Sequence, residues 1–412
     1  MDVKKSTKIK IPIIGGGASG LFLANFLTMQ KGEAAIFERG ERLGRKLSAT
    51  GNGQGNITNV AVKNTPYFSS SSEGVALAEK WIARYDENSL REFFARLGVL
   101  VFFDERGRGY PTSRQASSLT DALRFSLERK GVETFLSTQI VALEKRGETF
   151  LLTSGKGERF EAETVVLCAG GKAAKNFGTD GSAYALAEKF HHTITALYPS
   201  LVQLKTDTSA IRALKGIRVF DAAVTAKWTE NGERKTHTLR GDIIFTDYGV
   251  SGDAVFRLSA FLAAQKDGML SIDFLPDVSL AELQTALQNK RAAFPDMADE
   301  ERLCGIVNNQ VGRAIMKSVR NADDSAVAKA VKAFSLPVKG TLGFDYAQVT
   351  KGGISLKEVD ENLQSRNVQG LYFAGEILDI DGECGGFNLQ WAYASARAVA
   401  AAINAQKGKR RG

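Results

Sequence analysis

The chain has 412 residues, enough for two or three domains of ordinary size. Hydrophobic residues make up 43% and charged residues 24% of it, the proportions of a folded globular protein, which excludes the disordered and fibrous classes. The net charge of +8 is mild and lacks the concentrated basic stripe of a nucleic-acid-binding protein, so nucleic acid is not expected as a partner.

The cysteines and the apolar runs bear on the compartment. Cys168, Cys304 and Cys384 lie far apart without a CxxC pair, so we expect no disulfide framework and a reducing compartment, the cytoplasm. No apolar run reaches the ~18 residues of a membrane span, so no membrane association is expected. The short run 11–14 stops at glycines without the cleavage site of a secretory leader.

Residues 8–37 predict a strand, a glycine-rich turn, a helix and a second strand. Pro12 is unusual in such a strand because proline removes a ladder donor. Helical patterns follow around residues 81–97 and 119–129. Between residues 131 and 171 the pattern changes to an antiparallel meander and then a buried apolar strand at residues 164–168.

Residues 190–274 read as strands, and Asn231-Gly232 between two alternating segments predicts a hairpin. Residues 276–336 are helical, and Ser279 with Glu282 forms a capping-box pattern. Strand and turn signals return before residue 350. The chain closes with a short strand inside Gly370–Glu376 and a helix over residues 388–405.

Gly15, Gly17 and Gly20 form a GxGxxG pattern between the first strand and the first helix. The first glycine permits a tight turn, the second lets a diphosphate approach the backbone, and the third lets helix and strand pack closely. The phosphates then meet the helix N-terminus at Ala18 and Ser19. Glu38 follows at the end of the next strand, where a carboxylate accepts ribose hydroxyls and repels a 2′-phosphate, so the nucleotide is FAD or NAD.

The other end of the chain decides between these two nucleotides. Gly370–Glu376 delivers a carboxylate at the end of a strand, suited to ribityl hydroxyls. Gly385–Trp391 opens a helix whose N-terminus suits the electron-rich pyrimidine edge of a flavin. The cofactor expected is therefore FAD, and extraction of the bound nucleotide separates it from the remaining alternative, an NAD-only dehydrogenase.

The sequence resembles a family of bacterial NAD(P)/FAD-dependent oxidoreductases, of the aminoacetone-oxidase-like and bile-acid-dehydroxylation flavoprotein type, with a glutathione-reductase-like FAD fold. The resemblance covers nearly the whole chain. Its motifs are IIGGGASG, FERGERLGRKLSATGNGQGNITN, FTDYGVSGDAV and GLYFAGEILDIDGECGGFNLQWAYASA. It implies an α/β fold: a Rossmann-like FAD-binding domain, with a parallel sheet and a β-meander, at 1–190 and 350–412. A β-rich domain at 191–275 and 336–349 is inserted in it, and a small helical domain at 276–335 is inserted in that.

The resemblance also assigns cofactor-binding residues. Glu38 would bind the adenosine ribose, Ile140 would meet adenine through its backbone, and Glu376 would hold the ribityl chain. The full set of expected cofactor contacts is Gly15, Gly17, Ala18, Ser19, Gly20, Glu38, Arg39, Arg45, Lys46, Ile140, Ala169, Gly170, Gly171, Gly375, Glu376, Gly386, Asn388 and Leu389. For Arg39, Arg45 and Lys46 the alternative stays open that they are solvated charges, and Ile140 is a core residue in either case.

The chain departs from the resembled family in two places. It has Gly51-Asn52-Gly53-Gln54-Gly55-Asn56 where the family reads GNGRCN, and Thr246 to Asp253 carry aspartates where it reads THYGxSGPA. We expect FAD binding to survive these changes. The substrate and the chemistry near the flavin are not carried over.

Several activities are excluded or left open by the remaining residues. A disulfide reductase needs a cysteine pair beside the flavin, which three isolated cysteines do not supply, although Cys384 alone could be a reactive thiol. Adjacent His191 and His192 point in different directions, so no metal site is expected. No second GxGxxG follows a strand between Gly171 and Gly370, so NAD(P)H, if used, is a transient electron donor.

The function expected is an FAD-dependent oxidoreductase that transfers hydride between a small organic substrate, or NAD(P)H, and the bound flavin. The alternative is a flavoprotein in which FAD is structural and the basic tail from Lys407 to Arg411 serves an RNA- or protein-binding module. The sequence identifies no catalytic acid or base, no particular substrate and no oligomeric state.

Overall fold

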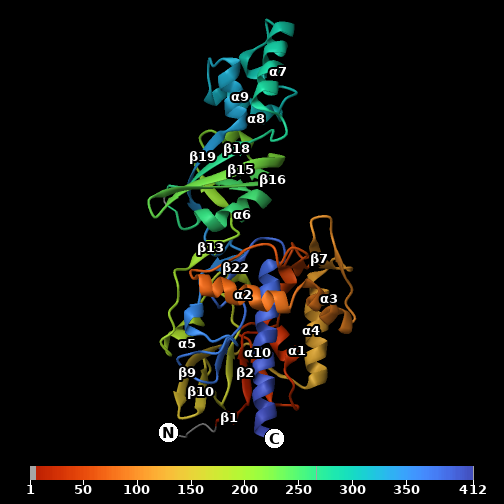
Figure 1. The fold of residues 1–412 in the computed structure, drawn as a ribbon, viewed down its shortest axis with the longest axis vertical. Coiled ribbons are helices and arrows are strands. Elements are labelled where there is room, and N and C mark those ends of the chain that lie inside the picture. Colours follow the sequence, from red (N-terminus) through yellow and green to blue (C-terminus); the bar gives the residue numbers. More distant parts are fainter. Residues whose placement is uncertain (1–5, 266, 412) are drawn as a thin grey trace. The chain divides into compact units, whose positions relative to one another are not determined.

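A computed structural model describes residues 6–265 and 267–411, with the backbone alone from residue 408 on. The chain forms two compact units, one of Met1–Tyr198 with Val349–Gly412 and one of Pro199–Gln348 (Figure 1). The chain crosses between them at β13 (Tyr198–Ser200) and just ahead of β20 (Val349–Lys351). The predicted division into three domains stays a prediction.

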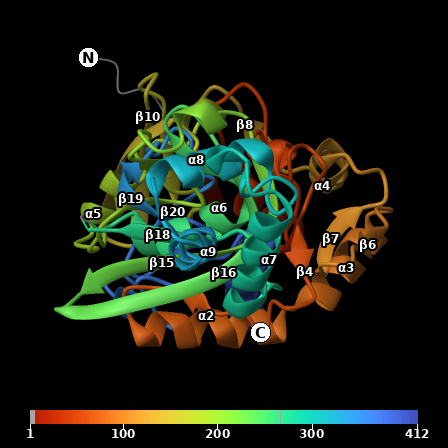
Figure 2. The ribbon, with the colours of Figure 1, turned by 90° about the horizontal axis from the view of Figure 1, so that it is seen from above.

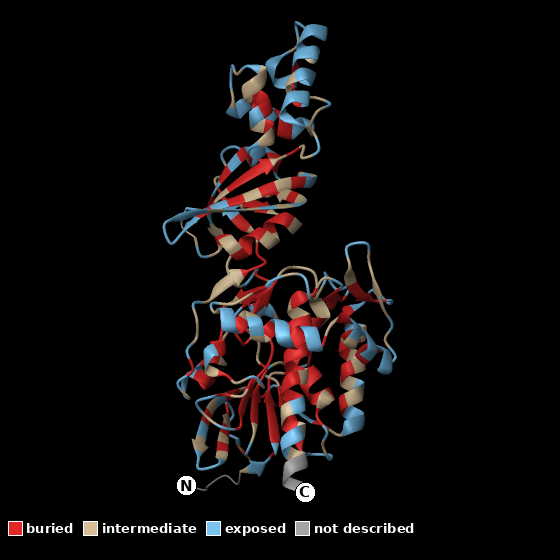
Figure 3. Ribbon diagram, in the orientation of Figure 1, coloured by how far each residue is buried: buried red, intermediate tan, exposed pale blue. Residues whose placement is uncertain are grey.

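The first unit is built on a five-stranded sheet. Its order is β21 (Leu371–Phe373), β12 (Val165–Leu167), β2 (Ile11–Ile14), β3 (Ala34–Phe37) and β8 (Glu133–Phe135). The paired strands all run parallel. All residues of the four strands from β21 to β3 are buried, as expected for a parallel sheet covered on both faces (Figure 3). The predicted Rossmann-like α/β fold is confirmed.

Pro12 lies inside β2 without interrupting the sheet. Pairing of β2 with β12 begins at Ile13, one residue after the proline. On the other side, β2 pairs with β3 from Ile11 to Ile14. The N–H donor that Pro12 lacks would therefore lie just before the first hydrogen-bonded pair between β2 and β12. A proline destabilises a sheet least at such a position.

The helices of this unit are α1 (Ala18–Phe26), α2 (Ser72–Arg84), α3 (Glu87–Arg96), α4 (Ala116–Lys130), α5 (Tyr184–Glu188) and α10 (Phe387–Arg411). Phe22 of α1 is fully buried among aromatic rings of α3 and α10. Its ring centroid lies 5.9 Å from that of Phe93 and 5.4 Å from that of Tyr393, both edge-on. Such packing favours aromatic pairs beyond their buried area and joins helices from the two ends of the chain.

Smaller sheets lie beside the five-stranded one, and β20 pairs with β13 where the chain passes between the units. The predicted meander is confirmed as β9 (Ile140–Arg146), β10 (Thr149–Ser154) and β11 (Arg159–Ala162), with β1 (Thr7–Lys8) added beside β11. A second sheet has the order β4 (Thr58–Asn59), β7 (Arg108–Pro111) and β6 (Val101–Phe103). A third pairs β22 (Asp381–Gly382) with β5 (Tyr67–Phe68).

The second unit is a closed six-stranded antiparallel barrel. Its order is β14 (Leu204–Thr206), β17 (Gly249–Ser251), β16 (Glu233–Phe245), β15 (Arg218–Glu230), β18 (Met269–Asp273) and β19 (Phe334–Thr341), with α6 (Asp253–Leu262) following β17. The predicted hairpin at Asn231-Gly232 is confirmed, since both residues have positive φ and Glu230 pairs with Glu233. Its two strands run side by side over 13 residues each (Figure 2).

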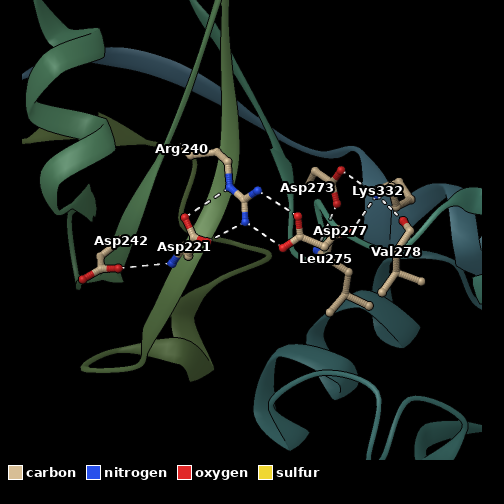
Figure 4. A network of polar contacts seen from close by, with 8 residues as sticks. All are labelled: Asp221, Arg240, Asp242, Asp273, Leu275, Asp277, Val278 and Lys332. Atoms are coloured by element: carbon tan, nitrogen blue, oxygen red, sulfur yellow. Dashed lines mark hydrogen bonds and ion pairs between the residues drawn. The ribbon is translucent and has the colours of Figure 1, made fainter.

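The helical segment of this unit comprises α7 (Leu280–Ala293), α8 (Asn309–Ser318) and α9 (Asp324–Lys332), and these helices share one hydrophobic core with the barrel. The capping box of Ser279 and Glu282 is confirmed at the start of α7. Polar contacts also link the segment ahead of α7 to the barrel and to α9 (Figure 4). Arg240 on β16 binds Asp221 and Asp277, and Lys332 on α9 donates to the carbonyl of Val278.

Across the described residues, no helix combines the length and the apolar character needed to cross a membrane.

Glu33, just ahead of β3, links the two ends of the first unit. Its carboxylate accepts hydrogen bonds from Lys10, near the start of β2, and from Lys407, in the last turns of α10 at 2.9 Å. Its side chain is 7% exposed. The hydrogen bonds from Lys10 and Lys407 lower the pKa of Glu33 to about 2.

We predict that Glu33→Gln lowers the free energy of unfolding at pH 7 by about 1–2 kcal/mol. Because the folded-state pKa lies below the unfolded value of 4.5, the contribution is complete above that value and is lost as the pH falls toward 2. Denaturant titrations from pH 7 to pH 3 should show the two proteins converging. Glu148→Gln, in the exposed turn after β9, should leave stability unchanged at every pH, and an equal effect of both variants would refute the link.

Candidate functional site

The sequence-predicted site residues gather at one edge of the parallel sheet. Gly15 follows β2, Glu38 follows β3, Ala169 lies two residues after β12, and Glu376 lies three residues after β21. Because these strands are parallel neighbours, their carboxyl ends lie at one edge, which is where open α/β sheets bind ligands. Segments from both ends of the chain thus meet around the start of α1.

The three glycines of the GxGxxG pattern have different surroundings. Gly15 has φ of 109°, and a Cβ there would lie 2.5 Å from the carbonyl oxygen of Cys168. A Cβ on Gly20 would lie 2.0 Å from the carbonyl oxygen of Gly15. At Gly17, by contrast, a Cβ would meet no atom within 4 Å. Gly15 and Gly20 are therefore required by packing, while Gly17 borders the open space that a diphosphate needs to reach the backbone.

The N-terminus of α1 is free of side-chain capping. Gly17 is its N-cap residue and supplies no side chain to the first N–H groups, and the first turn carries no acidic residue. Ala18 and Ser19 begin the helix, and the Ser19 hydroxyl donates to the carbonyl of Cys168 at 3.4 Å. Backbone N–H groups and the helix dipole at this end favour a bound anion. The residues present fit a nucleotide diphosphate.

The C-terminal segment meets this helix start directly. A Cβ on Gly375 would lie 2.7 Å from the Cβ of Ser19, so glycine allows the two segments to approach. The Gly375 carbonyl accepts a hydrogen bond from Trp391 Nε1 at 3.2 Å, and its N–H donates to the Ser395 hydroxyl at 3.0 Å. The turn after β21 is thereby fixed to α10 on one side and to α1 on the other.

The Glu38 carboxylate is held in place by the backbone. Its Oε2 accepts the N–H of Gly16 at 2.9 Å, and its Oε1 accepts the N–H of Gly40 at 2.7 Å. A carboxylate oxygen has two lone pairs, so each oxygen can accept a further hydroxyl. Beside the glycine turn, this arrangement suits the two hydroxyls of an adenosine ribose.

Each of the three predicted basic residues has a partner in the structure. Arg39 pairs with Asp180 at 2.6 Å, and Arg45 donates to the carbonyl of Asn176 at 2.8 Å. Burial alone would raise the pKa of Asp180, but hydrogen bonds from Arg39 and Ser182 bring it down to about 2. Both arginines thus reach the segment that follows β12.

Lys46 pairs with Glu376 at 2.7 Å, both side chains being about four-fifths buried. The other oxygen of Glu376 accepts the N–H of Thr350 at 2.9 Å. The Thr350 hydroxyl in turn accepts the N–H groups of Lys172 and Ala173, at 2.7 and 2.9 Å. Thr350 therefore ties the turn containing Ala169, Gly170 and Gly171 to the carboxylate that the ribityl chain is predicted to contact.

Sequence reasoning missed Thr350. It is the middle residue of the three-residue strand β20, and its neighbours Lys351, Gly352 and Gly353 do not indicate that its hydroxyl meets a segment so far away in the sequence. The pairing becomes visible only when β20 and the turn after β12 are placed together.

The start of α10 is a glycine turn packed against β4. Gly385 and Gly386 have φ of 123° and 103°, and a Cβ on Gly386 would lie 2.4 Å from the carbonyl oxygen of Thr58. The Asn388 amide bonds both the N–H and the carbonyl of Gly382, at 2.9 and 2.8 Å, and so closes the preceding turn. Leu389 is partly buried and packs on the core. The predicted flavin contacts of Asn388 and Leu389 stay predictions.

The sequence marks two further residues, Ile140 and Cys384. Ile140 is buried at the start of β9 and pairs with Ser154 of β10, which leaves its predicted adenine contact untested. Cys384 forms no disulfide within the described residues and is partly buried just before the glycine turn.

Comparisons with known proteins agree with this arrangement. Residues 9–402 match a family model described as HI0933-like protein Rossmann domain. The chain is 35% identical over 407 residues to a 3-dehydro-bile acid delta(4,6)-reductase of Clostridium scindens, an alignment covering 94% of this chain and 97% of that protein. It is 27% identical to the ribosomal RNA dihydrouridine synthase of Escherichia coli, over 96% of this chain and 98% of that one.

Among solved structures, the chain is similar to a 3-ketosteroid-delta4-(5alpha)-dehydrogenase from Rhodococcus jostii RHA1. The TM-score is 0.49 at 16% sequence identity, with 97% of this chain and 98% of that chain covered.

We predict that Gly17→Ala separates folding from nucleotide binding. The added methyl group meets nothing in the nucleotide-free protein and costs less than about 1 kcal/mol as an N-cap change, but it occupies the path of the diphosphate. Isothermal titration of FAD-stripped protein should show FAD affinity lowered by about tenfold or more, equivalent to about 1.4 kcal/mol. Thermal unfolding without FAD should be nearly unchanged.

Gly20→Ala is the matched control, because its Cβ would collide with the carbonyl of Gly15. It should destabilise the protein whether or not FAD is present. A well-folded Gly17→Ala protein with unaltered FAD affinity would contradict the assignment of this helix start.

Proposed function

Because the chain belongs to the HI0933-like protein Rossmann domain family, we propose that it is an FAD-dependent reductase that saturates a carbon–carbon double bond conjugated with a carbonyl group in a small organic substrate. The observation that carries the proposal is the arrangement at the carboxyl edge of the sheet, where Gly17, Glu38 and Glu376 come together from both ends of the chain. The protein is an enzyme and a flavoprotein, and its cofactor is FAD.

The reaction class is supported by the names of the relatives. The relative at 35% identity is named for a delta(4,6)-reductase acting on a 3-dehydro-bile acid, whose ketone is conjugated with ring double bonds. The relatives at 27% identity are named for making dihydrouridine, which is uridine with two hydrogens added across a double bond conjugated with a carbonyl. The same chemical step therefore serves two substrates of very different size.

The residues of the chain hold and orient the cofactor. The N–H groups at the start of α1 bind the diphosphate, Glu38 accepts the adenosine ribose hydroxyls, and Glu376 with Lys46 holds the ribityl chain. When bound and reduced, FAD would supply the hydride for the carbon β to the substrate carbonyl, while the α carbon takes up a proton from water. We propose NAD(P)H as the electron donor; because the sequence has no second GxGxxG after a strand between Gly171 and Gly370, this donor would bind only transiently.

The small-molecule substrate is favoured over RNA by the closer relative, whose identity is 35% against 27%. The alternative hypothesis, in which FAD is structural and the protein is an RNA- or protein-binding module, rests on the net charge of +8 and on the basic tail. The side chains of that tail from Lys409 on lie outside the described residues. The three cysteines form no disulfide within the described residues, which suits a reducing compartment, and we propose the cytoplasm as the location of the protein.

We predict that the purified protein absorbs at flavin wavelengths and is bleached anaerobically by NADH or NADPH. A 3-oxo-4,6-diene bile acid should then restore the flavin colour with formation of one saturated product bond per flavin. The matched control is the fully saturated 3-oxo bile acid, which has the same skeleton without the conjugated bond and should leave the flavin bleached.

Two results would overturn the proposal. One is a colourless protein that cannot be reconstituted with FAD. The other is a bleached protein whose colour a uridine-containing ribosomal RNA fragment restores while the diene does not, which would assign the same chemistry to RNA.

A further inference from the structure

The sheet β4-β7-β6 lies next to the glycine turn that opens α10. Asn59 on β4 donates through its side-chain amide to the carbonyl of Gly385 at 3.2 Å. In the register of this sheet, Asn59 is opposite Arg108, and Phe102 is opposite Tyr110. Opposed residues of antiparallel strands share a face, and Arg108 and Tyr110, two residues apart, also share it. One face of the sheet therefore carries these groups beside the predicted flavin end of the site.

Arg114 is stacked over the two aromatic residues of this face. Its guanidinium carbon lies 4.3 Å from the ring centroid of Phe102 and 4.9 Å from that of Tyr110. The two rings are themselves stacked at 6.1 Å with an interplanar angle of 27°. Cation–π contact of this kind fixes the orientation of a guanidinium and removes water from one of its faces.

No carboxylate forms an ion pair with Arg114 in the part of the chain that the structure describes. Arg108, on the same face, is paired with the carboxylate of Asp104 at 2.8 Å. The guanidinium of Arg114 makes one hydrogen bond within the described part of the chain, at 3.2 Å, to the amide oxygen of Gln54. That acceptor carries no charge, so Arg114 keeps a full positive charge in a fixed place.

Gln54 and Gly55 are the two residues at which the chain departs from the resembled GNGRCN motif, and Gln54 stands in place of its arginine. An arginine at position 54 would place a second guanidinium against Arg114 and repel it. The glutamine accepts a hydrogen bond instead, which gives the departure a physical reason.

An apolar strip runs beside this cation. Leu100, just ahead of β6, has 66% of its surface exposed, and Phe102, two residues on and therefore on the same face, is partly buried. This apolar strip ends at the guanidinium of Arg114. Such a surface suits a ligand that is apolar along its body and anionic at one end.

We propose that Arg114 binds the carboxylate of an apolar acid substrate whose body lies along Leu100 and Phe102. The inference rests on the proposed function and specifies its substrate class: the substrate is an acid, and Arg114 selects it over neutral compounds of the same skeleton. The planar fork of the guanidinium suits two parallel hydrogen bonds to a carboxylate.

The test measures binding, so it does not depend on turnover. FAD-loaded wild-type protein and Arg114→Gln are titrated by calorimetry with a 3-oxo bile acid and with its methyl ester. The wild type should bind the acid at least about tenfold more tightly than the ester, the size of one charge-assisted contact. Arg114→Gln should lose that preference and bind the ester as before. Arg106→Gln, on the exposed turn of the same hairpin, is the matched control and should behave as the wild type.

Three results would overturn the inference. The wild type could bind acid and ester equally, or Arg114→Gln could weaken both equally with a fall in thermal stability, which would mark the stack as structural. The third is a loss of affinity for an oligouridine RNA with unaltered acid binding, which would assign the cation to a phosphate. If the diene is not reduced while acid binding still depends on Arg114, the proposed reaction fails and the binding inference stands.

Discussion

The structure of the first unit depends on the close approach of backbone segments around the start of α1, one of which comes from the other end of the chain. Gly15 lies against Cys168, Gly20 against Gly15, and Gly375 against Ser19, and a Cβ at any of the three glycines would collide with its neighbour. These contacts bring the carboxyl ends of β2, β12 and β21 together around the start of α1. The binding edge is therefore a product of the fold as a whole, because no continuous segment of the chain contains it.

Charge pairs reinforce the same arrangement at both edges of the sheet. Lys46 and Glu376 join residues 330 positions apart at the edge where the cofactor is proposed to bind, and Lys407 joins Glu33 near the amino ends of the strands. Buried pairs of this kind are weak evidence for stability, since desolvation offsets much of their attraction. Their value here is positional: Glu376 is presented with one oxygen on Thr350 and the other on Lys46.

Local patterns predicted local structure well. The hairpin at Asn231-Gly232, the capping box at Ser279 and the first βαβ unit follow from backbone chemistry that a few neighbouring residues determine. The sequence could not indicate that six strands of the second unit close into a barrel, or that Thr350 would fix the turn at Gly171, because these depend on pairings between distant segments. Asn388 is a similar case: its amide is engaged with Gly382, a contact that its place in a glycine-rich motif does not reveal.

The central claim is that one FAD molecule is held by both ends of the chain at once. Hydrogen–deuterium exchange of FAD-stripped protein, before and after FAD is added, measures this most directly because it reports each backbone segment separately. The account predicts that residues 15–20, 38–40 and 374–389 become protected together, at the same FAD concentration. Protection confined to the first of these segments, with the C-terminal segment exchanging as before, would contradict it.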